Sequence, residues 1–136
     1  MSENIPLEQY ADEQGGLLIA TVNVSLRVEG PGNRYVDGIR VIDPPEGEGE
    51  KYDYHKLPNN KPVWDLLSNH RIELIEVHNW GLQVLGDCLG KAAIIENEFA
   101  PVEVKKTVIV NTGQPNEPAV EEVYEDYGVD WVVIES

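Results

Sequence analysis

The chain has very little cysteine and no long hydrophobic run. Its single cysteine, Cys88, excludes an internal disulfide and a cysteine-rich metal site. No apolar run approaches the ~20 residues that a membrane-spanning helix requires. The start of the chain, MSENIPLEQY, has neither the basic region nor the apolar region of an export signal. We therefore expect a cytoplasmic protein without a membrane segment, in which Cys88 is a buried structural thiol.

Several motifs that would identify an enzyme class are also absent. The sequence has no glycine-rich phosphate loop ending in Lys-Ser or Lys-Thr and no dinucleotide-binding fingerprint. It has neither the HExxH zinc motif nor the glycine-flanked serine of the α/β-hydrolases. Function must therefore be argued from individual residues and from the order of the predicted elements.

Basic residues are few compared with acidic ones. The chain has 25 Asp and Glu against 10 Lys and Arg, for a net charge of -15. Nonspecific binding to nucleic acid or anionic lipid should be poor in ordinary salt, since Lys and Arg supply that affinity by replacing phosphate counterions. Two explanations for the charge are open: adaptation to a salty cytoplasm, and imitation of nucleic acid. Because acids occur in nearly every segment, the halophilic interpretation is favoured.

The order of predicted elements indicates an α/β protein. With 136 residues, 41% of them hydrophobic, the chain suits one domain spanning residues 1–136. From residue 71 onward the predicted elements alternate between strand and helix, which favours parallel pairing of these later strands, while the first two strands fit a hairpin. We expect a mixed central sheet of about five strands. The predicted strands cover 16–28, 34–42, 71–79, 105–112 and 129–135, the helices 64–70, 82–99 and 115–128, and an exposed loop or insertion 44–63.

The helix predicted at 82–99 has one apolar face. Its apolar residues recur at helical spacing: Leu82, Leu85, Leu89, Ala92 and Phe99. Gly86 and Gly90 weaken the helix. We interpret these glycines as a sign of close packing.

The stretch RIELIEVHN, residues 71–79, alternates like a buried strand but carries three ionisable groups. Side chains alternate across an extended chain, so Glu76 and His78 share a face with apolar neighbours, while Glu73 points to the opposite face. We expect Glu73 to be solvated. Glu76 and His78 lie where the strand either leaves the core or enters a site.

Together with Asp37 on the preceding predicted strand, these residues carry a resemblance. Asp37 lies in RYVDGIRVI, and Glu76 and His78 lie in the next strand, which a helix follows at once. This order resembles the PD-(D/E)XK nuclease superfamily, whose core places an acid on one strand and then an acid, any residue and lysine on the next. The resemblance covers roughly residues 13–135 and implies a restriction-endonuclease-like fold.

The resemblance also implies a catalytic site. Carried over by position, Asp37 matches the first metal-binding acid, Glu76 matches the acid of the second motif, and His78 stands where the lysine belongs. In that chemistry two carboxylates hold Mg²⁺, which polarises a phosphate and activates water, while the lysine orients the water and neutralises developing charge. A histidine would do part of this when protonated or when acting as a base.

Other acids compete for these roles. Glu8 or Glu13 precedes the first strand, where members of the superfamily often carry an acid on a helix. Glu103 and Lys105 also spell an acid, any residue and lysine, and they form a rival second motif. This rival fits the order of elements less well, because a helix precedes it.

Purely structural interpretations are open as well. Asp37 next to Gly38 suits a turn or a bulge, and Arg34 or Arg40 would then pair with it. His78 also suits a satisfied histidine at the end of a strand.

The expected function is metal-dependent phosphodiester hydrolysis, as in an endonuclease, or that of an inactive relative. The alternatives are a noncatalytic binding or assembly module of the same fold, and an acidic mimic of nucleic acid. Catalysis needs the carboxylates to converge, whereas mimicry needs them spread over one surface. Nucleic acid is the expected partner, together with a homodimer mate or another subunit, since so small a nuclease domain usually needs help in finding its target.

Overall fold

The structure is a computed structural model that describes residues 4–23, 35–42, 51–53, 68, 70–78, 80–110 and 117–134. Three helices of known extent are α1 (Asn4–Gln14), α3 (Leu82–Phe99) and α4 (Pro118–Asp126). The strands are β1 (Leu17–Asn23), β2 (Tyr35–Val41), β3 (Lys51–Asp53), β4 (Arg71–His78), β5 (Glu103–Val110) and β6 (Val129–Val133).

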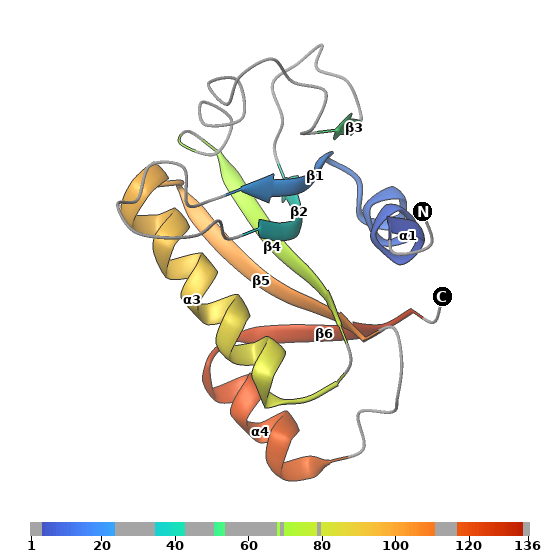
Figure 1. Cartoon of the computed structure of the whole chain (residues 1–136), viewed down its shortest axis with the longest axis vertical. Helices are drawn as coiled ribbons and strands as arrows, with labels where there is room; N and C mark the ends of the chain where they lie inside the picture. The colour runs from blue at the N-terminus through green and yellow to red at the C-terminus, as the bar shows by residue number, and fades with distance from the viewer. Residues whose placement is uncertain are drawn as a thin grey trace.

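The strands form one mixed sheet in the order β3-β1-β2-β4-β5-β6 (Figure 1). β2 pairs antiparallel with β1 and with β4, whereas β4, β5 and β6 run parallel. The predicted α/β class, the opening hairpin and the later parallel pairing are confirmed. The sheet has one strand more than expected, because β3 pairs with β1 inside the range 44–63 that we predicted as a loop. The rest of that range lies outside the described residues.

Helices cover both faces of the sheet (Figure 1). α3 and α4 pack on one face, where the larger core includes the buried side chains Leu74, Leu85 and Val108. Cys88 is fully buried in this core, as predicted, and burial raises the pKa of its thiol to about 12. No helix among the described residues is long and apolar enough to cross a membrane.

The predicted apolar face of α3 is largely correct. Leu85, Ala92 and Phe99 are buried and Leu89 is half-buried. Leu82, in contrast, is 54% exposed, because it lies in the first turn, at the end of the helix.

Helix α1 covers the opposite face and was not predicted. Its buried side chains Leu7, Tyr10 and Ala11 pack on a smaller core that includes Ile75. The helix ends at two glycines with positive φ, and a Cβ on Gly16 would lie 2.4 Å from a backbone oxygen of β2. Only glycine therefore allows the chain to turn so tightly from α1 into β1.

Gly38 lets α1 approach β2 closely. A Cβ at this position would lie 2.7 Å from the Leu7 side chain. Asp37 and Gly38 both belong to β2, and the β1–β2 pairing keeps the same register on either side of them, from Ala20↔Gly38 to Val22↔Val36. The alternative of a turn or bulge at this point is therefore wrong.

Candidate functional site

Asp37 and Glu76 meet where β2 and β4 stop pairing. The last pair of the β2–β4 ladder is Gly38↔Ile75, and Asp37 and Glu76 are the next residues on the two strands. The Val77 amide donates to Asp37 Oδ2 at 2.8 Å, and the Asp37 amide points to Glu76 Oε2 at 3.5 Å. Beyond the last pair of the ladder, hydrogen bonds to side chains therefore connect β2 and β4, and the two predicted acids lie side by side.

Lys91 of α3 completes this cluster. Its Nζ lies 2.7 Å from Glu76 Oε1, and its side chain is 20% exposed. Lys91 follows the buried Cys88 by three residues, so the helical period places it on the edge of the face that covers the sheet. We did not select Lys91 from the sequence, although this spacing from Cys88 was a signal that could have found it.

His78 lies at the end of the strand, as one of the two interpretations from the sequence expects. It is the last residue of β4, and its side chain is exposed. The cation in contact with the Glu76 carboxylate is the ammonium group of Lys91.

The Glu76 carboxyl has a strongly altered acidity. Its side chain is only 6% exposed, and burial raises its pKa from the usual 4.5 to about 7. The hydrogen bond from Lys91 opposes this increase, while the negative charge of Asp37 adds to it. A carboxyl group with a pKa near neutrality, beside a second acid and a lysine, is typical of functional sites.

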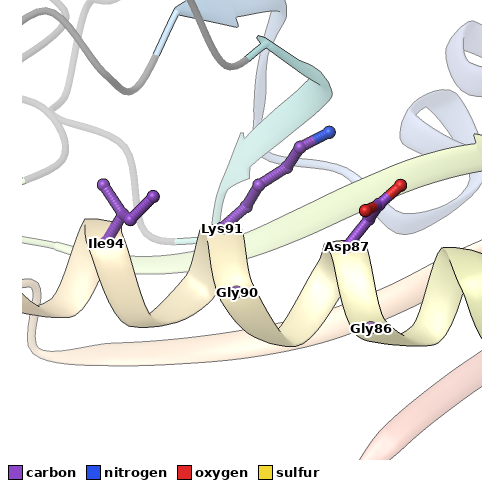
Figure 2. Close-up of a pocket in the computed structure, with 5 residues that line it drawn as sticks. All are labelled: Gly86, Asp87, Gly90, Lys91 and Ile94. Carbon is purple, nitrogen blue, oxygen red and sulfur yellow. The ribbon is translucent and has the colours of Figure 1, made fainter. Parts of the chain in front are cut away.

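A depression of about 240 Å³ lies beside Lys91 on the surface of α3. Figure 2 shows its lining residues: Gly86, Asp87, Gly90, Lys91 and Ile94. Asp87, Lys91 and Ile94 project from one side of the helix toward the strands (Figure 2). A Cβ on either glycine would meet no heavy atom within 4 Å. Our prediction that these glycines mark close packing is therefore wrong: their missing side chains leave the helix surface open.

The competing acids lie elsewhere. Glu8 and Glu13 are exposed on α1, which covers the other face of the sheet. Glu103 pairs with Arg71 at the beginning of the β4–β5 ladder, whereas Glu76 pairs near its end. Lys105 lies close to Glu73, at 3.7 Å. The rival motif is thus separated from Asp37.

Glu73 lies in an environment opposite to the predicted one. We expected a solvated side chain, but Glu73 is fully buried beneath α1. Its carboxylate binds the hydroxyls of Tyr10 and Thr107, each at 2.6 Å, and Arg40 Nε at 2.7 Å. Arg40 therefore pairs with Glu73 and not with Asp37, while Arg34, the other arginine proposed as a partner of Asp37, lies outside the described residues.

The cluster offers two carboxylates to a cation. Asp37 and Glu76 supply hard oxygen donors, which suit Mg²⁺ or Mn²⁺. Within the described ranges no group of three or more acids, histidines or cysteines has the geometry to hold a metal ion. Two carboxylates still fit Mg²⁺, because this ion keeps several waters and also binds phosphate oxygens of the substrate.

Comparison with known proteins found no relatives: no family model, no curated protein and no solved structure matches this chain.

Proposed function

We propose that this protein is a metal-dependent nuclease of the PD-(D/E)XK type. The observation that supports the proposal is the convergence of Asp37, Glu76 and Lys91 at the end of the β2–β4 ladder. Two acids and a lysine are the groups that this chemistry requires. They come from three separate elements, so their proximity follows from tertiary structure and not from closeness in sequence.

In this proposal Asp37 and Glu76 hold Mg²⁺, which when bound polarises a phosphate and makes water more acidic. Glu76 must be ionised to bind a cation, and its neighbour Lys91 favours that ionised form. The Asp37 carboxylate is kept in place by the Val77 amide. The chain thus holds both ligands before any metal arrives, which lowers the cost of ordering them.

We assign the lysine's role to Lys91, in place of His78. An ammonium group next to the acids stabilises the negative charge that develops on a phosphate during hydrolysis. Lys91 also borders the open depression, so a phosphate group could approach it between the two glycines. The net charge of -15 opposes this approach, and the proposed enzyme would therefore depend on the metal or on a partner to bind nucleic acid.

A second candidate is a noncatalytic binding or assembly module of the same fold. One observation favours it: the candidate groups already satisfy one another. Lys91 is ion-paired with Glu76, and Asp37 accepts a backbone hydrogen bond. Such contacts would persist in a descendant that had lost catalysis.

Titration calorimetry with MgCl₂ and MnCl₂ distinguishes the two candidates. A nuclease should bind either ion at millimolar concentration or more tightly, and binding should be lost in Asp37→Asn and in Glu76→Gln. Glu103→Gln is the matched control, because Glu103 is an exposed acid at the far end of β4 and β5. Cleavage of DNA or RNA should then need the metal, both acids and Lys91. Wild-type protein that binds neither ion would refute the nuclease proposal.

A further inference from the structure

A buried ion pair links β2 to β4 on the face opposite the candidate site. Arg40 is 6% exposed and Glu73 is fully buried. Arg40 also donates to the Gly15 carbonyl at 3.1 Å, and Glu73 accepts hydrogen bonds from Tyr10 and Thr107. The pair and its hydrogen bonds therefore connect four elements: β2, β4, α1 and β5. Burying charge in such a position costs free energy.

The Arg40–Glu73 ion pair and the Asp37–Glu76 acid pair both depend on the same alignment of β2 with β4. Arg40 lies directly opposite Glu73 in the β2–β4 ladder. Three residues farther along each strand, Asp37 comes next to Glu76. An odd separation puts the two pairs on opposite faces of the sheet. Any change of register that separates one pair separates the other.

The apolar residues of this ladder do not select that alignment by themselves. Ile39 lies opposite Leu74, and Val41 lies opposite Ile72, all on the α3 face. A shift by two residues would keep every side chain on its face and would still leave one aliphatic pair, Ile39 opposite Ile72 in one direction or Val41 opposite Leu74 in the other. The hydrophobic pattern therefore excludes a shift by one residue but opposes a shift by two less strongly, because one aliphatic pair remains.

The charged residues do exclude the shift by two. After such a shift, Arg40 would lie opposite Arg71 in one direction or opposite Ile75 in the other, as the observed register shows. Glu73 would then be buried without its guanidinium partner. Buried pairs of this kind add little net stability, but an unpaired buried charge is strongly destabilising, and setting register is their best-attested role.

We propose that the Arg40–Glu73 pair acts as a positioning device that fixes the register of β2 against β4 and thereby brings Asp37 to Glu76. The geometric part of this inference stands on the ladder and the buried pair alone. Its consequence for metal binding rests on the function proposed above.

The test is amide hydrogen exchange, measured by NMR in the absence of metal, in the double variant Arg40→Met/Glu73→Gln. The glutamine oxygen can still accept from the Tyr10 and Thr107 hydroxyls, so the double variant removes the two charges together with the hydrogen bonds that Arg40 donates to Glu73 and to the Gly15 carbonyl. We expect the Val77 amide, which binds Asp37, to exchange at least about tenfold faster than in the wild type. Amides of the β5–β6 ladder should keep their rates.

Lys105→Met is the matched control. Lys105 also approaches Glu73, but it lies on β5, is 40% exposed and does not join β2 to β4. We expect wild-type exchange at Val77 in this variant. If the double variant does not fold, Arg40→Lys serves in its place; it keeps the charge, and an intermediate increase is expected. If the Val77 amide exchanges at the wild-type rate in whichever of these variants folds, the proposal is overturned.

Titration with Mg²⁺ separates this inference from the proposed function. Faster exchange at Val77 in a protein whose wild type binds no Mg²⁺ would support the positioning role and refute the nuclease. Mg²⁺ binding by the wild type, with exchange at Val77 unaffected by the double variant, would support the nuclease and refute the positioning role. If both hold, the double variant should also lose at least about tenfold in Mg²⁺ affinity.

Discussion

Glu76 should make the stability of this protein depend on pH near neutrality. Its carboxyl lies between the sheet and α3, where burial raises the pKa from 4.5 to about 7. In the unfolded chain the same group regains its usual pKa. The folded state therefore holds this proton more tightly than the unfolded state does.

The sign and size of the effect follow from that difference. Because the folded pKa is raised, the contribution of Glu76 to stability is fully present below about pH 4.5 and is lost as the pH increases through about 7. At ~1.4 kcal/mol per pKa unit, the increase corresponds to about 3 kcal/mol. The free energy of unfolding of a typical domain is roughly 5–15 kcal/mol, so the contribution of Glu76 is a large part of it.

The assay is urea unfolding of the wild type and of Glu76→Gln at several pH values from 5 to 8, at constant ionic strength. Glutamine keeps the shape of the side chain but does not titrate. Repulsion among the many other acids also weakens the protein as the pH rises, and this contribution cancels when the two proteins are compared. Glu103→Gln is again the control, because Glu103 is exposed.

We expect the wild type to lose about 2–3 kcal/mol relative to Glu76→Gln across this range, mostly between pH 5 and 7. Millimolar Mg²⁺ should reduce the loss at pH 8 if the cation binds the ionised group. A difference between the two proteins that stays constant within about 0.5 kcal/mol would refute the reasoning, because the buried carboxyl would then titrate as it does in water.

Further outcomes are expected from salt, packing and the candidate site. If the acid excess is halophilic, the melting temperature should rise as KCl increases from tenths of molar to molar, where the Debye length is only ~3 Å; a flat or falling value would exclude that interpretation. Leu85→Ala should cost about 2–5 kcal/mol in urea unfolding and Leu89→Ala clearly less, because Leu89 is half-buried; equal small losses would contradict the packing of α3. Gly90→Ala should stabilise α3 by about 0.5–1 kcal/mol, since the added methyl meets no atom, and a destabilised variant would show that the site is tighter than described. In nuclease assays Lys91→Met should abolish activity while His78→Ala retains it, and the opposite pattern would return the lysine's role to His78.

Local patterns were sufficient to predict most of the elements. The alternation in RIELIEVHN predicts β4, and the helical spacing of Leu85, Ala92 and Phe99 predicts α3, because each pattern reflects one covered face within a single element. Helix α1 escaped prediction because its sequence, NIPLEQYADEQ, has only a weak apolar face. Its burial depends on Gly38 of β2, which accepts Leu7 at close range.

The candidate site was predicted only in part. Asp37 and Glu76 were predicted from their positions on neighbouring strands, which resemble a nuclease motif, and the structure does bring them together. Lys91 was missed because it belongs to a different element: its spacing from Cys88 indicates the edge of the covered face of α3, but the sequence does not indicate that this edge lies beside Glu76.

The sequence alone determined the class of fold, the order of its main strands and helices, and the face that Glu76 shares with its apolar neighbours, because these depend on periods of two and of 3.6 residues within one segment. Tertiary structure decided whether a face would be buried or exposed. Glu73 is buried because α1 folds over it and Arg40 compensates its charge, whereas Gly86 and Gly90 are exposed because no element covers that side of α3 in the described part of the chain. Burial and charge pairing are properties of segments brought together from distant parts of the chain, so no local pattern contains them.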